Sequence, residues 1–265
     1  MTLKSLRPRL TAIGSGKGGT GKTFVALALA QAFADLGERV LICDADLGLA
    51  NVTVQLGAAN GGDLPGWLAG RIVLADAIAH VALPSHAGFD LLSAPAGSGA
   101  LADSDAETGE RLAAMLKSAS AYNRILIDLS AGVGAATMTL AAHADDTLVL
   151  ATPDPASLTD AYAFTKLMVK RTAGRPPSIV INMAGGAGEA KRTAETLIRS
   201  AQSFLKVAPD YLGYIPNDTR VVEAVRRQSM LCMLYPQSPA VAAIETLACA
   251  LGGQIGNLKI APSLR

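Results

Sequence analysis

Hydrophobic residues along this chain gather in short continuous runs, which Gly-rich turns and longer segments of mixed polarity separate. Continuous apolar runs are typical of strands that a parallel sheet buries on both faces. Their alternation with helix-like segments predicts helices on both faces of such a sheet. The predicted strands are Leu10–Ser15, Arg39–Cys43, Phe89–Ala94, Arg124–Asp128, Asp146–Ala151, Ser178–Met183 and Tyr211–Ile215.

The segments between these runs are expected to be helical. Thr23–Leu36 is rich in Ala and Leu and is followed by Gly37, a residue suited to the left-handed conformation that ends many helices. Residues 57–86 contain several Gly and Pro residues, which favours short helices and loops over the edge of the sheet. Pro239–Leu251 has an apolar stripe at helical spacing, as expected of a helix packed on the core. The other predicted helices are Ala106–Ser120, Ser157–Arg171, Glu189–Leu205 and Asp218–Gln228.

Composition agrees with one α/β domain. Half of the 265 residues are hydrophobic, which allows a sizeable core, and no run of about 18 apolar residues predicts a transmembrane helix. We expect a single-domain, doubly wound, mainly parallel sheet at residues 9–251. A short flexible N-terminus, residues 1–8, would precede it, and a C-terminal tail, residues 252–265, would follow.

Cysteine spacing and net charge indicate the compartment and the kinds of partner to expect. Cys43, Cys232 and Cys249 are far apart and lack metal-ligand spacing, so we expect them to be buried and reduced. The apolar run Leu10–Ile13 is too short for the core of a signal peptide, so we expect a cytoplasmic protein. The net charge of +1 gives no reason to require a nucleic-acid partner.

A glycine-rich loop between the first strand and the first helix carries the most specific motif. It fits GxxxxGK[ST] in the strand–loop–helix context that a phosphate-binding loop requires. Successive backbone N–H groups of such a loop point at phosphate oxygens, and the following helix adds the positive end of its dipole. Lys22 is expected to reach the β- and γ-phosphates of ATP, and the Thr23 hydroxyl to bind Mg²⁺. The predicted ATP-binding residues of this loop are Gly16, Lys17, Gly18, Gly19, Thr20, Gly21, Lys22 and Thr23.

The second lysine of the loop, Lys17, is not needed to bind phosphate within one subunit. A cation at that position could instead face the phosphates of a second subunit and neutralise charge in the transition state, as an arginine finger does. A lysine that is simply exposed on the loop is the alternative interpretation.

Acidic residues follow two of the predicted strands. Asp44 and Asp46 are two residues apart on an extended chain, so they are expected to point to the same side, above the phosphate site. One would help to hold Mg²⁺ through water, and the other would orient the attacking water. Gly48 and Asn51 are expected to continue into a switch-like loop. Asp128 ends a second apolar strand, the Walker B arrangement in which the carboxylate binds Mg²⁺ or its water shell.

Two further residues are candidates for contacts to the base. Asn182 ends the strand Ser178–Met183, and Pro216 follows the strand Tyr211–Ile215. Both strand ends are expected on the ligand side of the sheet, where an Asn amide can pair with the adenine edge. An Asn that serves only a turn is the alternative.

The segment from Lys17 to Thr23, KGGTGKT, resembles the deviant Walker A motif of the MinD/ParA family of ATPases. The resemblance implies an enzyme that hydrolyses ATP with Mg²⁺ and forms a homodimer when ATP is bound. It implies that Lys17 reaches the partner's nucleotide and that Lys17, Lys22 and Asp46 are the catalytic residues, with Asp46 orienting the water. It also implies metal-binding roles for Thr23, Asp44 and Asp128, and base contacts for Asn182 and Pro216.

Longer segments are similar to the flagellar-number regulators of this family, the FlhG or FleN subgroup. They are residues 44–52, DADLGLANV, residues 152–162, TPDPASLTDAY, and three segments of the C-terminal third: residues 215–218, IPND, residues 225–228, VRRQ, and residues 236–240, PQSPA. This resemblance implies control of flagellar number or placement, through protein partners in flagellar assembly or its transcriptional control. Recruitment to the cell pole or the inner membrane surface is a further expectation. Residues 252–265 contain three Gly and one Pro with only two charged residues, a pattern that predicts a poor interfacial helix, so we expect little membrane binding.

The alternative within the same family is a partitioning or positioning ATPase for DNA, the division site or another cargo. A metabolic ligase would need a substrate domain for which the chain has no room. A nucleotide-binding module without hydrolysis is disfavoured because Lys22, Thr23, Asp46 and Asp128 are all present.

Overall fold

The computed structural model describes residues 7–46, 51–58, 61–94 and 105–252. One eight-stranded sheet, in the order β3-β4-β2-β5-β1-β6-β7-β8, forms the centre of the molecule. Neighbouring strands pair in parallel except β3, which runs antiparallel to β4 at one edge. The strands are β1 (Arg9–Gly14), β2 (Val40–Ala45), β3 (Ala79–Val81), β4 (Phe89–Leu92), β5 (Arg124–Leu129), β6 (Asp146–Ala151), β7 (Ser178–Ala184) and β8 (Tyr211–Pro216).

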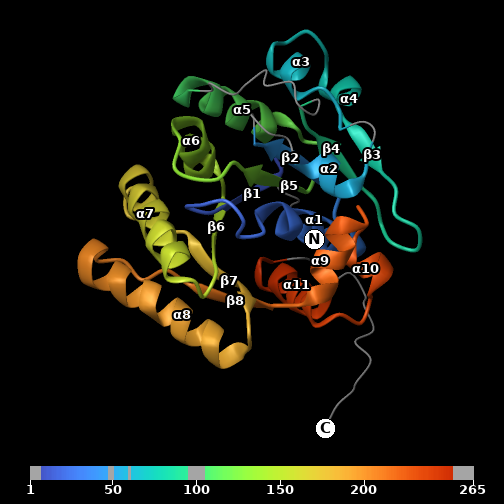
Figure 1. Ribbon diagram of the computed structural model, residues 1–265. Helices are drawn as coiled ribbons and strands as arrows, with labels where there is room; N and C mark the ends of the chain where they lie inside the picture. The colour runs from blue at the N-terminus through green and yellow to red at the C-terminus, as the bar shows by residue number, and fades with distance from the viewer. Residues whose placement is uncertain (1–6, 47–50, 59–60, 95–104, 253–265) are drawn as a thin grey trace, which may run out of the picture.

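Helices cover both faces of this sheet (Figure 1). Buried residues of α5 (Ala106–Ser118), α6 (Ala135–His143), α7 (Pro155–Arg171) and α8 (Ala187–Ser200) belong to one core cluster, together with α3 (Leu64–Leu68). The opposite cluster joins α1 (Lys22–Asp35) to the C-terminal helices. These are α9 (Thr219–Arg226), α10 (Leu231–Leu234) and α11 (Pro239–Ala250). The single-domain, doubly wound α/β class predicted from the sequence is therefore confirmed.

Helix α1 is buried along most of its length because it lies between the sheet and α11. It ends as predicted. Gly37 has φ +87°, its N–H donates to the Ala34 carbonyl at 2.8 Å, and the Glu38 N–H donates to the Phe33 carbonyl at 3.1 Å. α11 buries Ile244, Leu247 and Ala248, so the predicted core-packed helix is confirmed.

A buried ion pair joins the N-terminal end of β5 to the chain that follows α1. Arg124 donates from Nε to Glu38 Oε2 at 2.8 Å, and both side chains are nearly inaccessible. The guanidinium also lies 3.8 Å from the centroid of the Phe33 ring. This pair sits at the end of β5 opposite Asp128, so it supports the fold and not the site.

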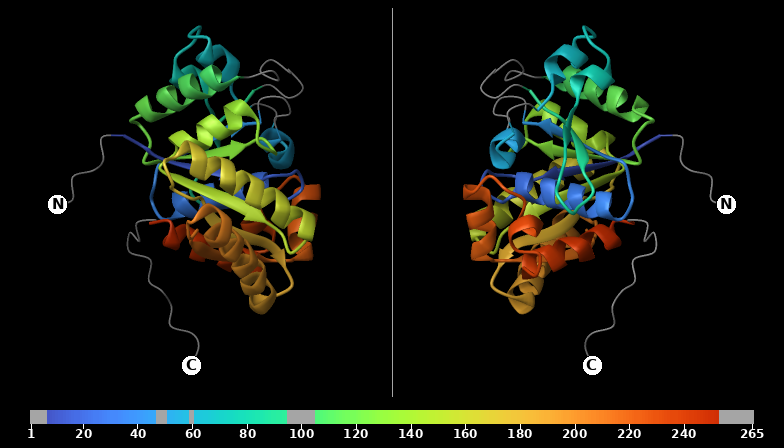
Figure 2. Two further views of the ribbon diagram at one scale, coloured as in Figure 1. Left: turned by 90° about the vertical axis from the view of Figure 1, so that its left-hand side faces the viewer. Right: turned by 90° about the vertical axis from the view of Figure 1, so that its right-hand side faces the viewer.

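The expected irregular region, residues 57–86, forms the short helices α3 and α4 (Leu74–Ala77), as predicted, and Figure 2 shows both at one end of the molecule beside α5. Helix α2 (Val52–Leu56) precedes that region. Strand β3 was not predicted, because three residues are too short for an alternating pattern to appear. The helix predicted as Glu189–Leu205 is α8 followed by a π-helical turn, η1 (Ala201–Leu205).

One helix was missed and one expectation was wrong. Helix α6 was not predicted, because a Gly-rich loop precedes it and its residues are mostly apolar, without a polar face that would mark a helix. Cys43 and Cys232 are buried, but Cys249 is exposed on α11. Residues 1–6 and 253–265, which make up most of the predicted termini, lie outside the described residues, as does Gly48. No helix in the described ranges is long and apolar enough to cross a membrane.

Candidate functional site

The glycine-rich loop connects β1 to α1 at the carboxyl ends of the parallel strands, in the position that phosphate-binding loops require. Gly21 has φ +89° and precedes α1 directly. A Cβ atom at Gly21 would lie 2.3 Å from Asn182 Nδ2, and one at Gly16 would lie 2.1 Å from the Asp160 carbonyl oxygen. Only glycine fits at these two positions, because the loop is packed between β7 and α7.

The lysine and threonine that open α1 face the loop and the sheet. Lys22 Nζ lies 3.2 Å from Ser15 Oγ, at the base of the loop. Burial lowers the pKa of Lys22, and the negative charges of Asp128 and Asp46 oppose that effect. Thr23 Oγ1 donates to Asp128 Oδ2 at 2.7 Å, so the Walker A hydroxyl and the Walker B carboxylate are in direct contact.

Two buried carboxylates lie side by side below the loop. Asp44 of β2 and Asp128 of β5 are register partners on neighbouring strands, and each is about 1% exposed. Burial, with a smaller contribution from the neighbouring charge of Asp44, raises the pKa of Asp128 to about 7. Burial also raises the pKa of Asp44 to about 6, although hydrogen bonds from the Val52 and Asp46 N–H groups and from Ser93 Oγ oppose it.

The residues present fit a divalent cation. Asp128 Oδ1 is buried and, among the described residues, has no hydrogen-bond partner, and the same is true of Thr20 Oγ1 in the loop. A cation beside Thr23 and Asp128 would satisfy that oxygen and offset the cost of the buried negative charge. Mg²⁺ in phosphate-binding loops needs few protein ligands, because phosphate oxygens and water supply the rest.

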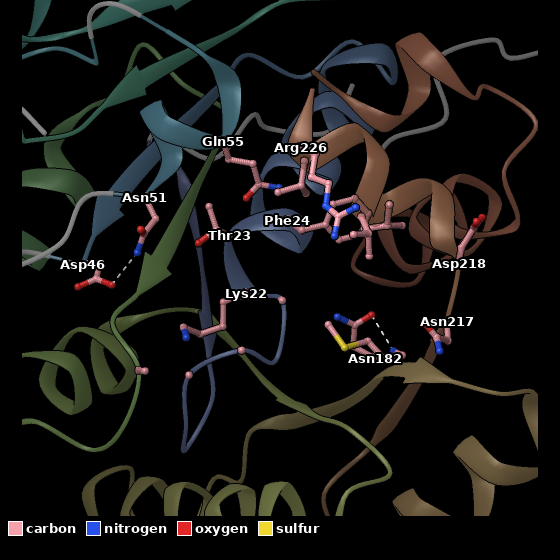
Figure 3. A pocket seen from close by; sticks show the side chains of 18 of the residues that line it. Lys22, Thr23, Phe24, Asp46, Asn51, Gln55, Asn182, Asn217, Asp218 and Arg226 are labelled. Atoms are coloured by element: carbon pink, nitrogen blue, oxygen red, sulfur yellow. Dashed lines mark hydrogen bonds between the residues drawn. The ribbon is translucent and has the colours of Figure 1, made fainter. Parts of the chain in front are cut away.

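A cavity of about 590 Å³ opens above the loop, and its size suits a nucleotide. Asp46 and Asn51 lie at one end of it, and Asn51 Nδ2 donates to Asp46 Oδ2 at 3.3 Å (Figure 3). Asp44 is not among the described lining residues, because its oxygens accept hydrogen bonds from the Asp46 and Val52 N–H groups and from Ser93 Oγ. The Asp46 side chain therefore lines the cavity and the Asp44 side chain does not, although the sequence predicted that both point to the same side.

Asn182 and Pro216 both line the opposite end of the same cavity. In this structure the Asn182 side chain holds the loop. Its Nδ2 donates to the Thr20 carbonyl at 2.8 Å, and its Oδ1 accepts from the Met183 N–H at 2.9 Å. Both residues are thus where a base would lie if the phosphates occupy the loop, and their contacts to adenine stay a prediction.

Lys17 differs from Lys22 in where its side chain goes. Its ammonium group forms an ion pair with Asp154, the residue that caps α7, and Lys17 is not among the described residues that line the cavity. The ion pair lowers the pKa of Asp154, with help from the N–H groups of Ala156 and Ser157. The second lysine of the loop therefore points away from the phosphate cradle of its own subunit.

Several lining residues were missed from the sequence. The wall made by α9 is largely apolar, while α1, α2 and β7 add side chains from distant parts of the chain. Neither periodicity nor motif spacing distinguishes such residues from ordinary surface positions. They are Phe24, Gln55, Met183, Val221, Val222, Val225 and Arg226.

The fold and the loop together define a P-loop ATPase. A family model for the CobQ/CobB/MinD/ParA nucleotide-binding domain matches residues 11–231, so the chain belongs to that family. The resemblance inferred from the loop and the fold it implies are thereby confirmed, as is ATP hydrolysis as the activity of the family.

Individual relatives agree with this assignment. The chain is 33% identical to the antiactivator FleN of Pseudomonas aeruginosa, over 92% of this chain and 86% of FleN. It is 29% identical to the flagellum site-determining protein YlxH of Helicobacter pylori, over 95% of this chain and 85% of YlxH. Among solved structures, MinD of Pyrococcus horikoshii complexed with Mg-ADP superposes with a TM-score of 0.75 at 26% identity, covering 94% of this chain and 98% of MinD. Nucleotide and Mg²⁺ binding is thus a property of a structural relative.

Proposed function

We propose that this protein is an ATP-dependent dimerisation switch that controls the number or placement of flagella. ATP with Mg²⁺ would hold two subunits together, and hydrolysis would release them. Within each subunit, Lys22 and the loop N–H groups would bind the phosphates, Thr23 and Asp128 would hold Mg²⁺, and Asp46 would orient the attacking water.

The main support for a dimer is that the Lys17 side chain points away from the cavity of its own subunit. Lys22 already lies at the phosphate cradle, and a second lysine there would add like-charge repulsion. Lys17 instead extends to Asp154 at the edge of the loop, outside the cavity of its own subunit. Across a dimer face it would exchange one exposed carboxylate for the several negative charges of the partner's nucleotide, in a site largely closed to water. Attraction is stronger there than at an open surface.

Analytical ultracentrifugation tests this proposal. The parent and Lys17→Ala are each compared with ADP and with a non-hydrolysable ATP analogue, and Lys191→Ala, an exposed lysine on α8, is the matched control. The parent and the control should form dimers with the analogue only, and Lys17→Ala should stay monomeric while it still binds nucleotide. A Lys17→Ala protein that dimerises like the parent would show that Lys17 is only an exposed loop residue.

The flagellar role is supported by the similarity to FleN and YlxH over more than nine-tenths of the chain. Deletion of the gene in its own organism should change the number or position of flagella, counted by electron microscopy. Unchanged flagella would favour the alternative, an ATPase that positions another cargo. A DNA cargo is tested by co-sedimentation at low and high salt, because nonspecific DNA binding weakens steeply as salt rises.

A further inference from the structure

Helix α2 connects the catalytic candidates to the rest of the site. At its start, Asn51 Nδ2 donates to Asp46 Oδ2 at 3.3 Å, and the Val52 N–H donates to Asp44 Oδ2 at 3.1 Å. With five residues, α2 is too short to be a stable helix on its own. Its contacts with neighbouring elements therefore decide where Asn51 lies, and with it the hydrogen bond that the Asp46 side chain accepts.

The far end of α2 meets the end of α9. Gln228 Nε2 donates to the Val54 carbonyl oxygen at 2.9 Å, although the two residues are 174 positions apart. Gly57, just after α2, permits this close approach, because a Cβ atom there would lie 3.0 Å from Gln228 Cβ. Val54 and Gln228 are both exposed, so the hydrogen bond is a direct tie between two surface segments.

The backbone conformation of Gln228 indicates a role for its side chain. Gln228 follows Arg227, which caps the end of α9, and it has φ +50°. Glycine is the residue usually found in this left-handed position after a helix, because a side chain there is strained. Glycine could not bond to α2. A strained residue at this point is explained by the hydrogen bond that its side chain makes.

Helix α9 is also a wall of the nucleotide cavity, through Val221, Val222, Val225 and Arg226. Figure 3 shows Arg226 and Gln55 of α2 on the same side of the cavity. A nucleotide in the cavity would contact α9, α9 holds α2 through Gln228, and α2 holds Asn51 against Asp46. The contacts thus form a continuous path from the base side of the cavity to the residue assigned to the attacking water.

We propose that Gln228 is a positioning residue for ATP hydrolysis, which ties α2 to α9 and so holds Asn51 where it orients the Asp46 side chain. This inference rests on the proposed function, in which Asp46 orients the water. Loss of the Gln228 hydrogen bond should lower kcat about fivefold, the rate equivalent of one neutral hydrogen bond. Binding of Mg·ADP should change little, because the loop that holds the phosphates is not part of the path.

The test uses substitutions of matched length in the full chain. Gln228→Met keeps the size of the side chain but cannot donate, and Gln228→Lys restores a donor that can reach the Val54 carbonyl. Gln202→Met, at an exposed position in η1, controls for loss of a surface glutamine. Steady-state hydrolysis gives kcat and KM for each protein, and hydrogen exchange gives the protection of residues 51–57 without nucleotide.

Gln228→Met should show a fall in kcat, an unchanged KM and faster exchange in α2, while Gln228→Lys and Gln202→Met behave like the parent. Adding Asn51→Ala to Gln228→Met should lower kcat little further, because both act through α2. Parental kcat in Gln228→Met would overturn the proposal, as would unchanged exchange. A parent that does not hydrolyse ATP would instead refute the proposed function, and the exchange result would still decide whether Gln228 positions α2.

Discussion

Replacement of Asp128 with Asn should stabilise the nucleotide-free protein and at the same time weaken its hold on Mg·ADP. The Asp128 carboxylate is buried beside Asp44, and its only hydrogen-bond partner among the described residues is the Thr23 hydroxyl, which donates to Oδ2. Asn keeps the shape of the side chain and an oxygen that can accept from Thr23. It cannot ionise, so it removes the cost of a buried charge and also the charge that Mg²⁺ would contact.

The magnitude follows from the pKa of Asp128, which burial and the charge of Asp44 raise from 3.8 to about 7. Because the folded-state pKa is raised, the cost to stability is nearly absent below about pH 4. It grows as the pH rises towards 7 and is constant above that, on the order of 4 kcal/mol. Asp128→Asn should therefore raise the free energy of unfolding by up to about 4 kcal/mol at pH 8 and by about 2 kcal/mol at pH 5.

Urea unfolding at the two pH values, with and without Mg·ADP, measures both effects. At a concentration of about 100 times Kd, Mg·ADP should stabilise the parent by about 2.7 kcal/mol and the variant by much less. Asp76→Asn, at an exposed position in α4, is the control and should change stability by less than about 0.5 kcal/mol. If Asp128→Asn is no more stable than the parent at pH 8, burial of the ionised carboxylate does not destabilise the fold. If Mg·ADP stabilises the variant as much as the parent, Asp128 does not belong to the metal site.

The remaining predictions concern the loop, the water and the buried ion pair. Lys22→Ala should lose Mg·ATP binding in isothermal titration, and equal affinity would refute the phosphate-loop assignment. Asp46→Ala should bind ATP but hardly hydrolyse it in a phosphate-release assay, accumulating as the ATP-bound dimer; a parental rate would remove Asp46 from its role. Arg124→Leu should lower the free energy of unfolding by about 3–5 kcal/mol, because it leaves Glu38 buried without its partner. Recovery of most of that loss in Arg124→Leu/Glu38→Leu would confirm the cause, and an unchanged urea midpoint in the single variant would contradict it.

Most of the fold was predictable because its strands are continuous apolar runs and its main helices are long. The strand ends that carry Asp44, Asp128, Asn182 and Pro216 could be placed on one edge for the same reason. Short or atypical elements were not predictable. β3 has three residues, and α6 is apolar on most of its surface, so neither shows the period that distinguishes a strand from a helix.

The phosphate loop was determined by the sequence alone, because eight consecutive residues carry both its backbone shape and its charge. Contacts between distant residues were decided only by the tertiary structure. Strand order buries Asp128 beside Asp44, which raises the pKa of Asp128, and the packing of α7 gives Lys17 its partner Asp154. Gln228 contacts Val54 only because the end of α9 packs beside α2 in the folded chain. The physical reason is the same in each case: burial and electrostatic interaction depend on distance in space, which the order of residues along a chain does not specify.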